Sequence, residues 1–189
     1  MLKYITLISI LFVASVTSYA QGEYSRNEVY GTYSYLKADI DFLADESLQG
    51  WGAGYQMNFH RYIGFVAEFG GNYGSSQFTV AVPGRIILAN TDTSLTTYLF
   101  GPRATYRTRP VNVYGHFLLG AGRNSAAGVS NTEFAMAIGG GVDVNLSRRF
   151  AIRAGQFDYL PVHSDLPLNA GGSSWFRNFR YQAGAVFRF

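Results

Sequence analysis

The segment RNFRYQAGAVFRF, residues 177–189, alternates two kinds of side chain up to a terminal phenylalanine. Successive side chains of an extended strand point to opposite faces, so every second residue shares a face. One face carries apolar and aromatic residues, namely Phe179, Tyr181, Ala183, Ala185, Phe187 and Phe189. The other face carries Arg180, Gln182 and Arg188, which suit a polar interior. The segment therefore predicts a strand that closes a transmembrane barrel with its apolar face toward lipid.

Residues 1–20 have the layout of a cleavable secretory signal. Lys3 supplies an early positive charge, an apolar run follows, and Ser18 and Ala20 are the small residues before the expected cut. The run is shorter than the roughly 20 residues that a membrane-spanning helix needs. We therefore expect a signal peptide over 1–20 and one barrel domain over 21–189. Because the chain has no cysteine, we expect no lipid anchor, disulfide or zinc-thiolate site.

The composition is unusual for a soluble protein. Charged residues make up 14% of the 189 residues, whereas soluble proteins have about a quarter, and aromatic residues reach 16%. The basic isoelectric point of about 9.2 is not accompanied by any run of Lys or Arg, so nucleic-acid binding is not expected. We interpret the arginines as packed against acids inside the barrel. No continuous apolar helix follows Ala20, so any membrane crossing must use strands paired in a closed ring.

The alternation of the terminal segment recurs along the chain. Eight segments show it, at about 28–36, 50–59, 63–73, 95–106, 111–122, 133–146, 150–159 and 177–189. Each is close to the 9–11 residues that a tilted transmembrane strand requires. The predicted fold is all-β: an eight-stranded antiparallel up-and-down transmembrane β-barrel.

The connections between these segments alternate in length. Tight turns are expected at 60–62, 107–110 and 147–149. Long connections are expected at about 37–49, 74–94, 123–132 and 160–176. Outer-membrane barrels have short periplasmic turns and longer extracellular loops, so both termini are predicted to be periplasmic.

Two positions break the regular pattern. Pro102 lacks the N–H that a strand without a free edge would use, so we expect a β-bulge there. In the seventh segment, Gln156 and Asp158 fall on the face assigned to lipid. Two explanations remain open at this point: a bulge shifts the register, or these residues already lie outside the hydrocarbon.

The polar face consists mainly of Gly, Ala, Ser, Thr and Asn. A lipocalin-like soluble barrel would place long charged side chains on its water-facing surface, whereas small residues suit the cramped lumen of eight strands. The large polar residues on this face, together with Tyr114 and His116, would fill the lumen. We predict a lumen charge cluster of Glu68, Arg103, Asp143, Arg153, Arg180 and Arg188. Aromatic residues near strand ends would form two interfacial girdles, including Tyr35, Trp51, Phe59, Tyr62, Tyr73, Tyr98, Tyr106, Phe150 and Phe189.

Several stretches together resemble the OmpA-like family, the eight-stranded "outer membrane protein beta-barrel domain". They are EVYGTYSYL (28–36), GWGAGYQMNF (50–59), RYIGFVAEFGG (61–71), FAMAIGGGVDVNLSRRFAIRAGQFDYLP (134–161) and YQAGAVFRF (181–189). The resemblance implies the outer membrane of a Gram-negative bacterium. It also implies that the last strand, with Tyr181, Phe187 and Phe189, is the signal read by the barrel-assembly machinery. No peptidoglycan-binding domain follows Phe189, so cell-wall tethering is not implied.

We expect a protein without catalytic activity that has a structural or adhesion-type role through its extracellular loops. The alternatives are a narrow, porin-like channel and, less favoured, an enzyme that modifies lipid A. His163, Ser164 and Asp165 are adjacent in sequence, but neighbours on an extended chain point apart, whereas a catalytic triad must converge. His116 is expected in the lumen and His60 in a turn, so neither can join them.

Two long connections are candidates for surface contacts. The connection 37–49 is acidic, and VAVPGRIILAN (80–90) is apolar for a stretch outside the membrane. The latter either extends the strands into a hairpin or forms a contact surface for a partner. The expected partners are outer-membrane lipid and lipopolysaccharide, the assembly machinery, and an extracellular ligand. We expect no cofactor, no metal site and no nucleic acid.

Overall fold

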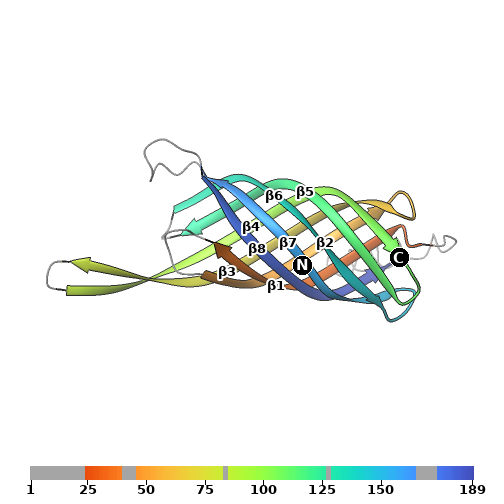
Figure 1. Ribbon diagram of the computed structural model, residues 1–189, viewed down its shortest axis with the longest axis horizontal. Helices are drawn as coiled ribbons and strands as arrows, with labels where there is room; N and C mark the ends of the chain where they lie inside the picture. The colour runs from red at the N-terminus through yellow and green to blue at the C-terminus, as the bar shows by residue number, and fades with distance from the viewer. Residues whose placement is uncertain (1–23, 40–45, 83–84, 127–128, 165–173) are drawn as a thin grey trace, which may run out of the picture.

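The strands of the chain close into a barrel. The computed structural model describes residues 24–39, 46–82, 85–126, 129–164 and 174–189. In this part of the chain, eight strands pair with their sequence neighbours, and the last pairs antiparallel with the first (Figure 1). They are β1 (Asn27–Asp39), β2 (Glu46–Asn58), β3 (Ile63–Val82), β4 (Arg85–Arg107), β5 (Val111–Ala126), β6 (Val129–Asn145), β7 (Phe150–Ser164) and β8 (Ser174–Arg188). The predicted fold class is confirmed, while the expected signal at 1–20 lies outside the described residues.

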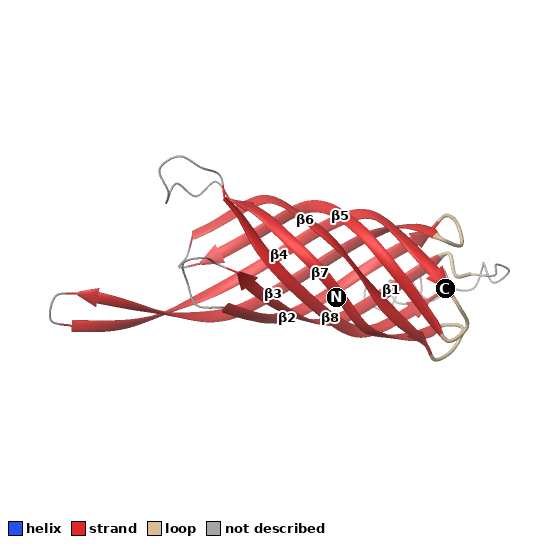
Figure 2. Cartoon of the chain, viewed as in Figure 1, coloured by secondary structure: helices blue, strands red, loops and turns tan. Residues whose placement is uncertain are grey.

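Strands and short turns account for nearly all of the described chain (Figure 2). Over the same residues, no helix has the length and apolar character needed to cross a membrane.

Three tight turns lie together at one end of the barrel (Figure 1). In the first, between β2 and β3, the Ile63 carbonyl accepts a hydrogen bond from the Phe59 amide at 3.1 Å. In the second, the Thr108 amide donates to the Val111 carbonyl at 3.0 Å, and the third is closed by Leu146 and Phe150 in the same way. The predicted tight turns are confirmed. We call this end of the barrel the turn end.

The long connection expected at 74–94 is mostly strand, so the extension of the strands into a hairpin, left open by the sequence for 80–90, is confirmed. β3 and β4 stay paired from Gly74 with Thr93 out to Val82 with Arg85. Figure 1 shows this hairpin extending well beyond the barrel, opposite the turn end. Strand continuation also shortens the other long connections, because β5 reaches Ala126 and β6 begins at Val129. Polar residues at 74–77 and 90–94 suggest a loop, whereas the strands continue their antiparallel pairing through them.

The two faces of each strand have the predicted environments. In β2, Trp51 is 50% exposed and faces outward, whereas Gln56 and Asn58, on the opposite parity of the same strand, are buried. Large apolar side chains are exposed around the whole wall, and at the turn end they include Phe59, Tyr62, Tyr106 and Phe150. An outward apolar surface of this extent is the surface that a transmembrane barrel presents to lipid.

A bulge in β7 explains the irregular seventh segment. The register with β8 shifts between Arg153 and Gln156, so that Ala154 and Gly155 together face Ala183. The register with β6 shifts at the same place. Beyond the bulge, Gln156 and Asp158 are buried in the lumen. Of the two explanations left open by the sequence, the bulge is the correct one.

The bulge expected at Pro102 is not present. Phe100 pairs with Leu119 and Arg103 pairs with His116, so the register of β4 with β5 is the same on both sides of the proline. Pro102 keeps its place opposite Phe65 on β3. The missing N–H therefore interrupts the ladder with β5 without displacing the strand.

Candidate functional site

The lumen holds the large polar residues of the chain. Inward glycines leave room for them, because a side chain at Gly54 would meet the Tyr30 ring and one at Gly52 would meet Thr32 and Gln182. All six residues of the lumen charge cluster are buried: Glu68, Arg103, Asp143, Arg153, Arg180 and Arg188. The interior is thus a packed core, as expected for eight strands.

Arg180 is the centre of one ionic group. Its Nη2 donates to Glu68 Oε1 at 2.5 Å and to Asp158 Oδ2 at 2.7 Å. The Tyr30 hydroxyl donates to the other oxygen of Glu68 at 2.7 Å. His116 Nε2 lies 2.9 Å from Asp158 Oδ1. Two carboxylates thus hold the Arg180 guanidinium, and Tyr30 and His116 each bond to one of these carboxylates. These contacts offset the cost of removing the charges from water.

Arg153 is the centre of a second group. Its Nε donates to Asp143 Oδ1 at 2.9 Å, and its Nη1 donates to Gln156 Oε1 at 2.9 Å. The guanidinium lies 4.0 Å from the centre of the Tyr30 ring. Arg103 lies 4.1 Å from the centre of the Tyr114 ring. The aromatic rings therefore separate two like charges and attract both of them.

A layer of leucines lies next to these ionic groups. Leu36 pairs across the sheet with Arg180, and Leu99 pairs with Glu68. Leu36, Leu99, Leu118 and Leu160 are each at most 1% exposed and belong to one apolar cluster. Leu48, Leu95 and Val162 continue this lining toward the hairpin end. Apolar side chains packed across a lumen disfavour the passage of water and ions.

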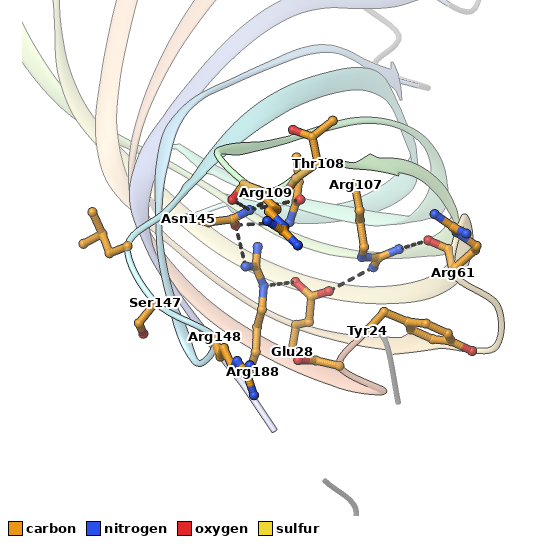
Figure 3. A pocket seen from close by; sticks show the side chains of 13 residues that line it. Tyr24, Glu28, Arg61, Arg107, Thr108, Arg109, Asn145, Ser147, Arg148 and Arg188 are labelled. Atoms are coloured by element: carbon orange, nitrogen blue, oxygen red, sulfur yellow. Dashed lines mark hydrogen bonds and ion pairs between the residues drawn. The ribbon is translucent and has the colours of Figure 1, made fainter. Parts of the chain in front are cut away.

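A third group lies at the turn end, shown in Figure 3. Glu28 accepts hydrogen bonds from Arg107 Nη2 at 3.0 Å and from Arg188 Nε at 3.2 Å. Arg188 also donates to Asn145 Oδ1 at 2.6 Å. These side chains form the floor of an open cavity of about 770 Å³.

Sequence reasoning missed three members of these groups. Glu28 lies on the inward parity of β1 and is buried, but it is not in the predicted lumen charge cluster. Asp158 falls on the lipid parity in the sequence, with a bulge as one of two explanations left open, and the bulge of β7 places it in the lumen. Arg107 was placed in a turn, whereas it ends β4 and reaches back to Glu28. The sequence carried two signals for these residues: the inward parity of Glu28 and the broken alternation at Asp158.

The histidines lie apart from one another. His116 is buried in the lumen and His60 lies in the first turn, as predicted. His163 is near the end of β7, opposite Trp175, and Asp165 lies outside the described residues. Within the described ranges, no three His, Asp or Glu side chains are grouped as a metal site would need. Among the described residues, the site offers buried ion pairs and an arginine-rich cavity.

Comparison with known proteins agrees with this architecture. The family model of the outer membrane protein beta-barrel domain matches residues 6–189. No curated protein matches the sequence significantly.

Solved structures share the fold at low sequence identity. Neisserial surface protein A superposes with a TM-score of 0.65 at 15% identity, covering 87% of this chain and 98% of that one. Ail, the attachment invasion locus protein of Yersinia pestis, gives 0.57 at 19% identity, covering 88% and 99%; that structure contains the heparin analogue sucrose octasulfate. OprG of Pseudomonas aeruginosa gives 0.53 at 13% identity, covering 88% and 96%.

Proposed function

The chain belongs to the outer membrane protein beta-barrel domain family, and from this premise we propose that it is a non-enzymatic surface-interaction protein. Its role is adhesion-type: the barrel anchors it in the outer membrane, and the extracellular connections bind a ligand. The β3–β4 hairpin is the observation that carries this proposal.

The hairpin extends far beyond the barrel wall. β2 pairs with β3 only as far as Tyr73, and β5 pairs with β4 only as far as Thr93. From there to Val82 and Arg85, the two strands pair with each other alone. At about 3.4 Å per residue, this free part is roughly 27 Å long. A ribbon of this length presents its backbone edges and both faces to whatever surrounds it.

The sequence of the hairpin favours a protein partner. The register pairs Val80 with Ile87 and Ala81 with Ile86, so apolar residues occupy both alternating positions. Arg85 and Asp92 are the charged residues between 74 and 92. Apolar stretches of this kind on an exposed element mark interaction sites. A sulfated glycan such as the ligand in the Ail structure would need more positive charge than this hairpin carries.

The orientation follows from the lengths of the connections. Short turns of outer-membrane barrels face the periplasm, which supports periplasmic termini and an extracellular hairpin. The terminal strand, with Tyr181, Phe187 and Phe189, would be read by the barrel-assembly machinery. Lipopolysaccharide would contact the outward aromatic residues at the hairpin end.

The lumen argues against the two alternative functions. A channel needs a continuous wet path, whereas buried leucines and ion pairs fill this interior. An enzyme needs accessible converging groups, whereas His116 is buried against Asp158.

Adherence assays test the surface-interaction role. Bacteria that are otherwise non-adherent would display the chain, and their binding to cultured cells and to immobilised extracellular-matrix proteins would be counted. We expect Val80→Thr with Ile87→Thr to lower binding about tenfold, which corresponds to roughly 1.4 kcal/mol of lost apolar contact. Both replacements remain β-branched, so the ribbon is kept.

The matched control is Ser76→Thr with Thr91→Val. These two residues are paired near the base of the same hairpin. This variant should adhere like the wild type. The proposal would be refuted if cells displaying the wild type adhered no better than cells with an empty vector. It would also be refuted if the Val80→Thr, Ile87→Thr variant adhered like the wild type.

A further inference from the structure

The cavity at the turn end is lined mainly by cationic and polar side chains. It opens between the three turns, and Figure 3 shows Arg107 and Arg188 converging on Glu28 at its floor. Five arginines line it, namely Arg61, Arg107, Arg109, Arg148 and Arg188, against the single carboxylate of Glu28. The lining therefore carries a large excess of positive charge within a concave space.

The negative charge of Glu28 is already engaged. Arg107 and Arg188 hold its two oxygens at 3.0 and 3.2 Å, and Glu28 is 4% exposed. Arg107 also donates to the carbonyl of Arg61. The floor thus has two guanidinium groups for one carboxylate, so it keeps a positive charge and does not cancel the charge of the rim.

Two rim arginines are not engaged by the described chain. Arg109 follows Thr108 in the second turn and Arg148 follows Ser147 in the third, and both are exposed. Neither guanidinium makes a hydrogen bond or ion pair with any residue that the structure describes. The turns themselves are held by other groups, since the Thr108 and Ser147 hydroxyls bond to the backbone. The two arginines are thus presented by fixed turns and remain available to a ligand.

We propose that this cavity binds phosphate groups. A concave, cation-lined site concentrates anions, and the planar guanidinium fork matches two phosphate oxygens at once. The exposed outward rings of Phe59, Tyr62 and Tyr106 belong to the same end. They place the cavity just outside the hydrocarbon, within reach of both soluble phosphates and phospholipid headgroups. The site is at the opposite end from the hairpin and is independent of any surface role.

Calorimetry on the folded chain in a non-ionic detergent tests this site. Inorganic pyrophosphate would be titrated at low salt, with retained heat-modifiable gel mobility as the check of folding. We expect pyrophosphate to bind. Arg109→Gln and Arg148→Gln should each weaken its affinity about tenfold, whereas Arg149→Gln should change the affinity by less than about twofold. Arg149 is the matched control, because it is an exposed neighbour in the same turn that does not line the cavity.

A second titration with short-chain phosphatidylglycerol, added below its micellar concentration, separates the two phosphate sources. Pyrophosphate binding alone identifies a soluble phosphate, and lipid binding that depends on Arg148 identifies a headgroup. The absence of binding by either probe would overturn the proposal. Equal losses in the Arg148 and Arg149 variants would do so as well, because they would indicate unspecific attraction to surface charge.

Discussion

At the residue scale, the lumen depends on the smallest side chains as much as on the charged ones. Tyr30 lies directly across the sheet from Gly54, and its ring packs against the guanidinium of Arg153. Its hydroxyl donates to Glu68, so one tyrosine joins the two ionic groups. The absent side chain of Gly54 is what gives this ring its space.

Gly54→Ala is therefore expected to disturb the ionic groups. The new methyl would meet the Tyr30 ring, and overpacking of this kind lowers the free energy of unfolding by about 1–3 kcal/mol. Urea titration of the refolded barrel, followed by tryptophan fluorescence, measures the change.

Gly31→Ala is the control, since nothing lies within 4 Å of a methyl there. It should change stability by less than about 0.5 kcal/mol. Equal losses in the two variants would mean that strand flexibility, and not space for Tyr30, explains the glycine.

At the scale of one element, the bulge in β7 interrupts backbone hydrogen bonding in a strand that crosses the membrane. An extra residue leaves backbone groups without ladder partners, and lipid offers none. The Tyr181 hydroxyl on the neighbouring strand donates to the Ala154 carbonyl at 3.0 Å. The Tyr181 side chain of β8 thus satisfies a backbone acceptor that the bulge leaves without a ladder partner. The same bulge turns Asp158 toward Arg180 in the lumen.

Tyr181→Phe removes this hydrogen bond and keeps the aromatic ring. Because an unsatisfied polar group costs about 1–3 kcal/mol, we expect a loss of stability in that range with normal assembly. The urea midpoint measures the loss, and gel mobility reports assembly.

Tyr33→Phe serves for comparison, because Tyr33 is an outward tyrosine of β1 that is 53% exposed. The urea midpoint of Tyr33→Phe should be close to that of the wild type. A Tyr181 variant as stable as the Tyr33 variant would show that the bulge needs no hydroxyl.

At the scale of the whole molecule, the barrel exists only once β8 has paired with β1. Asn27 and Phe189 exchange backbone hydrogen bonds at 3.1 and 3.0 Å, next to the buried pair of Glu28 and Arg188. The last residues therefore combine closure of the ring with packing of the lumen.

Deleting Phe189 and replacing Arg188 with alanine should separate these two contributions. The deletion removes a terminal aromatic residue and closing bonds, so we expect little protein in the outer-membrane fraction. Arg188→Ala should insert but unfold more easily, by about 1–3 kcal/mol, since Glu28 loses one buried partner and keeps Arg107. Membrane fractionation and urea titration measure the two effects. If the Phe189 deletion inserted normally and Arg188→Ala failed to insert, the two residues would not have the separate roles proposed here.

The filled lumen also predicts the electrical behaviour of the molecule. Planar-bilayer recordings of the purified barrel should show no stable conductance steps, because leucines and paired charges close the interior. A porin reconstituted in parallel provides the positive control. Reproducible steps from this chain would favour the channel alternative.

Much of the architecture could be predicted from the residue pattern. Side chains of a strand alternate strictly, so parity alone correctly put Glu68, Asp143 and Arg180 on the inward face. Parity failed wherever the backbone departed from regular pairing. Beyond the bulge of β7, parity alone puts Asp158 on the outward face, whereas the shifted register turns it into the lumen. The bulge expected from the missing N–H of Pro102 was wrong, because the register of β4 is the same on both sides of the proline.

The sequence by itself determined the strand number, the two faces and the residues available to the lumen, because these follow from local backbone geometry. Only the tertiary structure decided which charges pair, since Arg180 and Glu68 are far apart in the chain and meet through ring closure. It also decided that the turns gather Arg107, Arg109 and Arg148 around one cavity. Such groupings depend on the register and on closure of the barrel, and no single strand specifies either.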